Sequence, residues 1–314
     1  MIQLARWRCL GTIRSELTMK EQIGLIGIGL VGTALAKNLL GNGFSVVGYD
    51  IDPGRCAALE KIGGVSVSTP MEISEKVNRV ILSLMSTEIV REVLWASAGL
   101  LQSKATPAYI IDTTTSDPDA TVEIALQLKK QEIFYLDSPI SGSSAQIQER
   151  KGVVIVGGDP HAFERCRDLY SAIAEEFVHV GPFGSGSRAK LVSNVILGLN
   201  RLVLAEGLVY AERFGFDLDA LLVLLKKTPA YSCAMDVKGE KMIKGDFRPQ
   251  SRIKQHLKDL EIALSYAEKL KQPLPLTELH RNILKGAMDA GDGDLDNAAV
   301  IQQLRRMANR DRKK

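Results

Sequence analysis

The stretch from residue 22 to residue 50 most constrains how this chain can fold. A short apolar segment passes directly into the glycine-rich loop Gly27 to Gly32, a helical pattern follows, and a second apolar segment ends just before Asp50. Strand, glycine loop, helix, second strand and terminal acid within about 30 residues make up a βαβ unit. Glycines also occur in ordinary turns, so the complete order carries more weight than the loop alone.

The three loop glycines each meet a different requirement. Gly27 allows the tight turn after the strand, Gly29 leaves room for phosphates to approach the backbone, and Gly32 lets helix and strand pack closely. The first N–H groups of the helix then face the negative charge of a ligand. We therefore predict that the loop binds the pyrophosphate of a dinucleotide. The expected contacts are Gly27, Ile28, Gly29, Leu30, Val31 and Gly32.

Asp50 bears on the choice of dinucleotide. A carboxylate at the end of the second strand accepts hydrogen bonds from a free ribose hydroxyl and repels a phosphate in the same place. The sequence therefore favours NAD over NADP as the cofactor, although Arg55 lies close enough to weaken that preference.

The chain of 314 residues is long enough for two domains, each with its own core. Short β-rich segments alternate with helical patterns at residues 79–85, 108–115, 133–140, 152–157 and 176–181. This alternation predicts an α/β fold with a doubly wound, mostly parallel sheet. Helical patterns then continue to the end of the chain. We expect an N-terminal extension at 1–19, a Rossmann domain at 20–181 and an all-helical substrate and dimerisation domain at 182–314.

Composition argues against several classes of function. The net charge of +3 comes from 40 basic and 37 acidic residues without a basic stripe, so we expect no nucleic-acid partner. No run of 18 apolar residues indicates a membrane span. The cysteines form no CxxC pair and the histidines show no ligand spacing, which predicts no metal site and a reducing, cytoplasmic location. The acidic run at 292–296 lacks the final Glu of a calcium loop, and Asp296 is expected to cap the last helix.

The first 18 residues contain three Arg and one acid, a composition also seen in targeting peptides. A small-residue cleavage signal is missing, and Met19 stands just before the first predicted strand. An upstream extension of the true start is therefore the better interpretation.

The segment 188–214 is apolar on nearly every face of a helix. Such a helix has to be enclosed by its own domain or by a partner subunit, which predicts a homodimer or homotetramer. Gly198 and Gly207 would each cost it about 1 kcal/mol relative to Ala, so close packing is expected at both. Lys190 and Asn194 share one face. They either act on one small molecule, or Lys190 reaches solvent while Asn194 satisfies a carbonyl.

Five motifs in the same order resemble the β-hydroxyacid dehydrogenase family over residues 22–300. They are GLIGIGLVG at the first loop, IDTTTSDP at a strand end, LDSPISGS at a turn, GSGSRAKLVSN at a helix start, and KDL at 258–260. The resemblance implies an NAD-dependent oxidoreductase that acts on a small 3-hydroxy acid or its semialdehyde.

The resemblance also assigns roles to single residues. Lys190 matches the catalytic lysine, and Asn194 matches the asparagine that helps to hold the substrate hydroxyl. Ser141 and Gly142 match the turn that receives the substrate carboxylate, and Ser143, in place of a usual glycine, adds a hydroxyl to that turn.

The remaining cofactor contacts are expected at the nicotinamide end. Thr115 and Lys258 match family positions there, and Met85 ends the predicted strand 79–85. Departures from the family pattern at Ser251, Arg150 and Ser193 leave the particular acid open.

The expected chemistry needs a base. Hydride removal from an alcohol carbon leaves a proton on the oxygen, which neutral Lys190 can take and its ammonium can return. Burial lowers the pKa of a lysine towards working pH. Two alternatives stay open: an NADPH-dependent small aldehyde reductase of the same fold, which Asp50 disfavours, and a non-catalytic dinucleotide-sensing or scaffold protein, which would need neither Lys190 nor Asn194.

Overall fold

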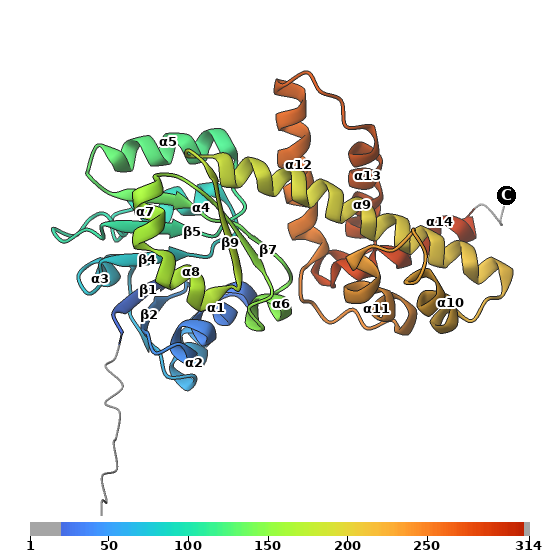
Figure 1. Cartoon of the computed structure of the whole chain (residues 1–314), viewed down its shortest axis with the longest axis horizontal. Helices are drawn as coiled ribbons and strands as arrows, with labels where there is room; N and C mark the ends of the chain where they lie inside the picture. Colours follow the sequence, from blue (N-terminus) through green and yellow to red (C-terminus); the bar gives the residue numbers. More distant parts are fainter. Residues whose placement is uncertain (1–19, 311–314) are drawn as a thin grey trace, which may run out of the picture.

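A computed structural model of the chain describes residues 20–310, and the expected extension at 1–19 lies outside them. A twisted sheet with helices on both sides occupies the first half, and a helical region follows it (Figure 1). The fold class predicted from the sequence is therefore confirmed. The long helix α9 (Ser185–Phe214) runs from the sheet into the helical region and joins the two.

The sheet within the described residues has nine strands in the order β3-β2-β1-β4-β5-β6-β8-β7, with β9 paired to β8. Neighbours from β3 to β6 are parallel, as are β8 and β9, whereas β8 is antiparallel to both β6 and β7. The strands are β1 (Gln22–Ile26), β2 (Ser45–Tyr49), β3 (Val65–Ser66), β4 (Arg79–Leu82), β5 (Tyr109–Asp112), β6 (Phe134–Asp137), β7 (Ile140–Ser141), β8 (Val153–Gly157) and β9 (Glu176–Gly181).

The two faces of the sheet carry separate apolar cores. Ile23 and Leu25 of β1 pack on one face and Ile26 on the other, because successive side chains of a strand point to opposite sides. Buried on both faces, the central strands are almost continuously apolar. The covering helices are α1 (Leu30–Gly41), α2 (Pro53–Lys61), α3 (Pro70–Ser74), α4 (Thr87–Trp95), α5 (Pro118–Lys129), α6 (Ser144–Gln148), α7 (Pro160–Arg165) and α8 (Arg167–Ile173).

The predicted strand at 133–140 is divided into β6 and β7. Pro139 lies between the two pieces and has no N–H group with which to continue the ladder. The chain leaves the parallel part of the sheet here, and β7 pairs antiparallel with β8. The turn that follows β7 therefore opens towards the helical region.

The helical region packs against one side of α9 and has its own core, in which Leu204 and Leu208 of α9 are buried. By length and composition α9 also passes as a membrane span, a criterion that core helices of soluble proteins meet as well. The other elements are α10 (Leu218–Leu225), a π-helical turn (Met235–Gly239), α11 (Glu240–Lys244), α12 (Ile253–Lys269), α13 (Pro275–Asp289), two 3₁₀ turns (Asp292–Asp294 and Asn297–Ala299) and α14 (Val300–Arg310).

The two glycines of α9 have different surroundings. A Cβ at Gly198 would collide with His256, so close packing explains this glycine. Gly207 is exposed and a Cβ there would meet nothing within 4 Å, so packing within the described chain does not account for this glycine. Asp296, expected to cap the last helix, caps the 3₁₀ turn that leads into α14.

Candidate active site

The glycine loop has the geometry that its sequence predicts. Gly27 has a φ of 91°, a conformation that favours glycine, and a Cβ there would collide with the carbonyl of Ser83. A Cβ at Gly32 would collide with the carbonyl of Gly27. At Gly29, in contrast, the nearest atom is 3.9 Å from the position of a Cβ. The loop is thus tight where it packs and open at Gly29.

The N-terminus of α1 is open to a ligand. Gly29 is its N-cap, no side chain caps the helix, and its first turn contains no acid. Backbone N–H groups at such a terminus bind phosphate oxygens. Together with the space at Gly29, this terminus fits the pyrophosphate of a dinucleotide.

Asp50 supports the loop from behind. Its carboxylate accepts hydrogen bonds from the N–H groups of Ile28, at 2.7 Å, and Asp52, at 2.9 Å, and its side chain is buried. Arg55 lies 3.3 Å from the same carboxylate and 3.5 Å from that of Asp52. Arg55 lines the cleft described next, whereas Asp50 does not.

A cleft of about 780 Å³ separates the glycine loop from the helical region. Sites for cofactors and small ligands commonly form at such domain junctions. Of the residues predicted from the sequence, the cleft is lined by Ile28, Gly29, Leu30, Val31, Met85, Thr115, Gly142, Lys190, Asn194 and Lys258. The other predicted residues are not among those that line it: Gly27, Gly32, Asp50, Ser141 and Ser143.

Lys190 is buried in this cleft, with 6% of its surface exposed, and therefore does not reach solvent. Burial lowers the pKa of Lys190 to about 8, and the negative charge of Asp259 opposes that shift. Asn194 Nδ2 donates a hydrogen bond to Asp259 Oδ2 at 2.8 Å rather than to a backbone carbonyl. The lysine and the asparagine thus share one carboxylate neighbour.

Lys258 crosses the cleft from α12 to the sheet. Its Nζ donates hydrogen bonds to the carbonyls of Met85, at 3.0 Å, and Thr115, at 2.7 Å. It also lies 3.2 Å from Asp259. The residues predicted to surround the nicotinamide are therefore brought together, with Lys258 as the link between them.

The turn after β7 faces α9. Ser141 Oγ lies 3.3 Å from Ser193 Oγ, and Gly142 lines the cleft. The hydroxyl of Ser143 instead accepts a hydrogen bond from the N–H of Gln146 and caps α6. This bond occupies one acceptor site of the hydroxyl and leaves its hydrogen free to donate, so a contact between Ser143 and the substrate stays a prediction.

Six charged residues that line the cleft were not among the predicted site residues, and two of them, Asp259 and Arg201, bear on the arguments below. Asp259 lies within the KDL motif, of which only Lys258 was assigned a role. Arg201 lies seven residues after Asn194 and so returns to the same face of α9. A charge at that spacing in an otherwise apolar helix is the signal that indicates it.

Two family models match the two halves of the chain. The NAD binding domain of 6-phosphogluconate dehydrogenase matches residues 22–181, and the model described as NAD-binding of NADP-dependent 3-hydroxyisobutyrate dehydrogenase matches residues 184–304. An open glycine loop that faces a buried lysine across a cleft agrees with these two NAD-binding models. The chain belongs to the β-hydroxyacid dehydrogenase family.

Individual relatives agree with this family. The chain is 32% identical to 2-hydroxy-3-oxopropionate reductase of Escherichia coli over 92% of this chain and 98% of the relative. It is 30% identical to 2-(hydroxymethyl)glutarate dehydrogenase of Eubacterium barkeri, over 91% and 95%. A solved 3-hydroxyisobutyrate dehydrogenase from Salmonella typhimurium superimposes with a TM-score of 0.82 at 26% identity, over 90% of this chain and 99% of the other.

Some relatives are longer. The cytokine-like nuclear factor N-PAC of Drosophila melanogaster is 28% identical over 93% of this chain, which spans 49% of that protein. The chain therefore spans about half the length of these relatives and nearly the whole length of the bacterial ones.

Proposed function

We propose that the protein transfers a hydride between NAD and a small 3-hydroxy acid or its semialdehyde, with Lys190 as general acid and base. The observation that carries this proposal is the buried lysine, whose pKa is lowered to about 8, in the cleft that faces the glycine loop. An amine with that pKa exchanges protons readily near neutral pH. The bound dinucleotide supplies the hydride acceptor or donor.

The chain's own residues divide the remaining work. Neutral Lys190 takes the proton of the substrate hydroxyl during oxidation, and its ammonium returns the proton during reduction. Asn194 positions that hydroxyl, and Asp259 holds the Asn194 amide through the 2.8 Å hydrogen bond. The turn at Ser141 and Gly142 receives the substrate carboxylate through its hydroxyl and backbone N–H groups.

The charges beside the glycine loop support NAD over NADP. The guanidinium of Arg55 lies between the carboxylates of Asp50 and Asp52, at 3.3 and 3.5 Å. One positive and two negative charges leave an excess of negative charge, which disfavours a 2′-phosphate. Asp50 acts through this charge and through its hold on the loop.

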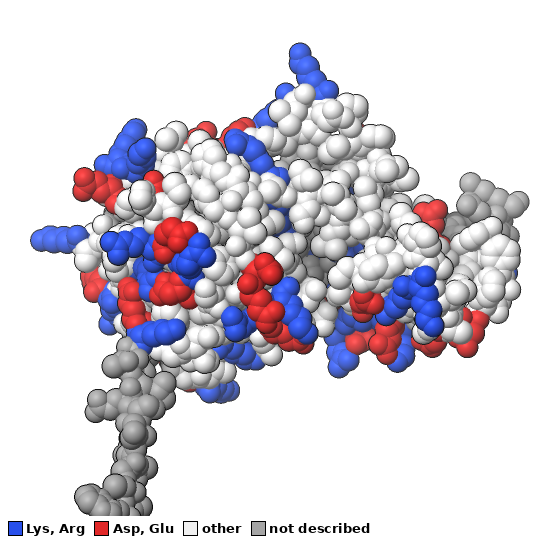
Figure 2. All heavy atoms as spheres, viewed as in Figure 1, with Lys and Arg blue, Asp and Glu red and all other residues white. Residues whose placement is uncertain are grey.

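An assembly of two or four copies fits the outer face of α9. Val192, Ile196, Val203 and Tyr210 are each more than half exposed along one side of this helix. Figure 2 shows a mostly uncharged surface over the part of the helical region that α9 crosses. A second copy that packs on this stripe would also explain the exposed Gly207, because glycine lets another backbone approach closely.

The location proposed for the protein is the cytoplasm. Cys56, Cys166 and Cys233 are free thiols in the described part of the chain, as a reducing compartment requires. The alternative of a non-catalytic scaffold does not explain why Lys190 is buried at a cost in solvation.

The test is a panel of small 3-hydroxy acids with NAD and NADP, followed by absorbance at 340 nm. Lys190→Met keeps the length of the side chain and removes the amine, so kcat should fall about 10²- to 10⁴-fold. Added methylamine should restore part of the lost rate. Lys254→Met, at an exposed lysine of α12, serves as the control and should keep wild-type activity.

The panel tests the role of Lys190 and the choice of NAD separately. Full activity of Lys190→Met on a good substrate would remove Lys190 from the mechanism. A preference for NADP of tenfold or more would overturn the choice of NAD and leave the rest intact.

A further inference from the structure

Arg201 extends the active face of α9 beyond the reacting residues. It follows Asn194 by seven residues, so both side chains lie on one side of the helix, and both line the cleft. Only 5% of the Arg201 surface is exposed. The mechanism described above gives this buried cation no task.

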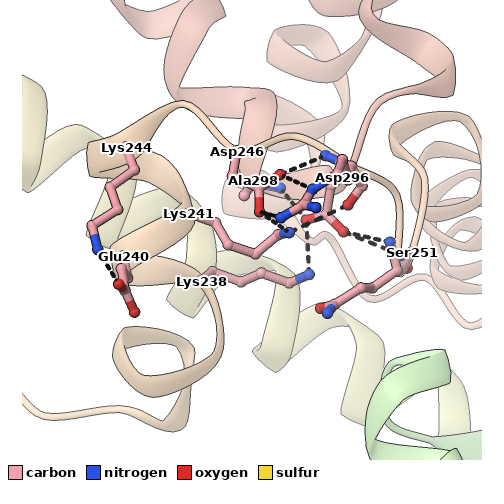
Figure 3. Close-up of polar contacts among 10 residues, drawn as sticks. Lys238, Glu240, Lys241, Lys244, Asp246, Ser251, Asp296 and Ala298 are labelled. Carbon is pink, nitrogen blue, oxygen red and sulfur yellow. Dashed lines mark hydrogen bonds and ion pairs between the residues drawn. The ribbon is translucent and has the colours of Figure 1, made fainter.

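Nothing on the protein fully neutralises Arg201. In the part of the chain from 20 to 310, no group accepts a hydrogen bond from its Nε. The acid whose charge acts on it is Asp296. That carboxylate is already bound to Lys238 Nζ at 2.7 Å and to the N–H groups of Ser251 and Ala298 (Figure 3). The hydrogen bonds of the Asp296 carboxylate thus go to Lys238 and to backbone N–H groups, and none of them goes to Arg201.

The other acids that line the cleft are also engaged. Asp259 pairs with Lys258 and accepts the amide of Asn194, while Glu149 pairs with Lys151 at 2.8 Å. A buried guanidinium without a paired anion is unfavourable. An anionic group brought in by a ligand would remove that cost.

The two imidazoles beside Arg201 add no negative charge. The rings of His256 and His280 lie with centroids 5.2 Å apart and are tilted by 50° to each other. Burial and the nearby Arg201 lower the pKa of both, that of His280 to about 4, so both are neutral near pH 7. Arg201 is therefore a buried cation beside two neutral rings.

The helix also sets where Arg201 stands relative to the reacting group. Ser141 touches Ser193 and so lies level with Asn194. Seven residues of helix correspond to about 10 Å along the axis. Helical side chains lean back towards the N-terminus, so the guanidinium of Arg201 comes closer to Asn194 than its Cα does. A ligand of five or six carbons can span from the turn to the arginine.

We propose that Arg201 binds a second carboxylate of the substrate, at the end opposite the carboxylate held by the turn at Ser141 and Gly142. The preferred substrate is then a 3-hydroxy acid that carries a further carboxylate. This inference rests on the proposed function, because it takes Lys190 and Asn194 as the site of the hydroxyl. The planar guanidinium can receive a carboxylate through two parallel hydrogen bonds.

The test uses two substrates of equal size with NAD. 2-(Hydroxymethyl)glutarate has the second carboxylate, and 2-(hydroxymethyl)pentanoate has a methyl group in its place. Wild-type kcat/KM should favour the diacid about 10²-fold or more. Arg201→Met should lower kcat/KM for the diacid roughly 10²- to 10³-fold and leave the monoacid within about threefold. Arg201→Lys keeps the positive charge but cannot form the two parallel hydrogen bonds, so its kcat/KM for the diacid should lie between those of the wild type and Arg201→Met.

Two outcomes overturn the inference. One is a wild-type enzyme whose kcat/KM for the monoacid equals its kcat/KM for the diacid. The other is an Arg201→Met variant in which kcat/KM falls by the same factor for both substrates. In that case Arg201 would bind the carboxylate that both substrates share, or it would only support the structure. In either case the activity lost in Lys190→Met still supports the proposed function.

A binding measurement needs no turnover. Glutarate, which lacks the hydroxyl, should raise the thermal unfolding midpoint of the wild-type protein with NAD, and butanoate should not. Arg201→Met should abolish the shift. If no hydroxy acid is oxidised but glutarate still gives an Arg201-dependent shift, the proposed function fails and the dicarboxylate site stands. If glutarate gives no shift with the wild type, the dicarboxylate site is refuted.

Discussion

Lys190 shows how the surroundings of a side chain can suit it to the proposed transfer of a proton. The cleft solvates its ammonium poorly, which lowers its pKa, and Asp259 stabilises the charge and limits that fall. The result, a pKa of about 8, leaves both protonation states accessible near neutral pH. A lysine that reached solvent would stay charged throughout this range.

The direction of the reaction should therefore respond to pH. Oxidation needs neutral Lys190, so kcat/KM for the hydroxy acid should rise with pH and level off above about 8. Reduction needs the ammonium and should fall over the same interval. Asp259→Asn removes the opposing charge and should move the midpoint to lower pH, as read from pH–rate profiles. Glu261→Gln, at an acid of α12 that pairs with Lys285, should leave the midpoint in place, and an upward shift in Asp259→Asn would contradict this account.

The role of the glycine loop can be tested by adding a methyl group to it. Gly32→Ala forces a methyl group against the carbonyl of Gly27, which should cost about 1 to 3 kcal/mol of stability and displace the loop. NADH binding, followed by fluorescence, should weaken tenfold or more. Gly41→Ala lies in the same helix where a Cβ meets nothing within 4 Å, and it should bind NADH like the wild type. Equal binding by both variants would show that the loop is not the cofactor site.

The sequence predicted the glycines well because their requirements are local. Gly32 is constrained by the carbonyl of Gly27 in the same loop, and Gly27 has a φ of 91° that the tight turn requires. The contact of Gly27 with Ser83, in contrast, joins distant segments. Ser143 could not be placed in this way, because its hydroxyl can bind both a ligand and the N–H of Gln146. Arg201 was missed for a related reason: its importance follows from which acids around it are already paired, and those acids come from distant segments.

Helix α9 has one side that faces the cleft and an opposite side that is exposed and apolar. Lys190 and Asn194 face the cleft, while Val192 and Val203 lie on an exposed apolar stripe. The sequence showed that this helix has too many apolar faces for solvent, but it could not divide them between the protein's own core and a partner. That division depends on where α12 and α13 pack, which periodicity within one helix does not determine.

A charge on the stripe should therefore dissociate the assembly. Val203→Glu places a carboxylate on a side chain that is 68% exposed in the single chain, so folding should be unaffected. Sedimentation velocity should show a shift from dimer or tetramer to monomer. Val65→Glu, on the edge strand β3 and 55% exposed, is the control and should keep the assembly of the wild type. A wild-type protein that sediments as a monomer would contradict the proposed role of the stripe.

The strands were predictable as elements because each is a short apolar run that ends in turn residues. The parallel order from β1 to β6 follows from the alternation with helices. The break at Pro139 and the antiparallel pairing of β7 were not predicted, since the run from 133 to 140 reads as one strand until its partner is known.

At the scale of the whole molecule, Lys258 ties the helical region to the sheet. Its two hydrogen bonds reach carbonyls that follow two neighbouring strands, at Met85 and Thr115. Ser144 adds a contact across the same junction, through a hydrogen bond to the carbonyl of Gln250. These contacts set the width of the cleft in which cofactor and substrate have to meet.

Loss of the Lys258 link should widen the cleft. Lys258→Met keeps the aliphatic stem and removes the donors, so the radius of gyration in small-angle scattering should increase and KM for NAD should rise about tenfold. Lys269→Met, which removes an exposed link from α12 to Asp119, is the matched control and should change both quantities less. An unchanged KM in Lys258→Met would show that the link has no part in holding the cofactor.

The unbroken length of α9 has a consequence for the living cell. In the proposed assembly, α9 would carry Lys190 on one side and contact a neighbouring copy on the other, so the neighbour would help to hold Lys190 in place. In dilute solution the copies would separate, and each monomer should then turn over substrate more slowly than it does in the assembly. The turnover number of each molecule would therefore rise with the concentration of the protein.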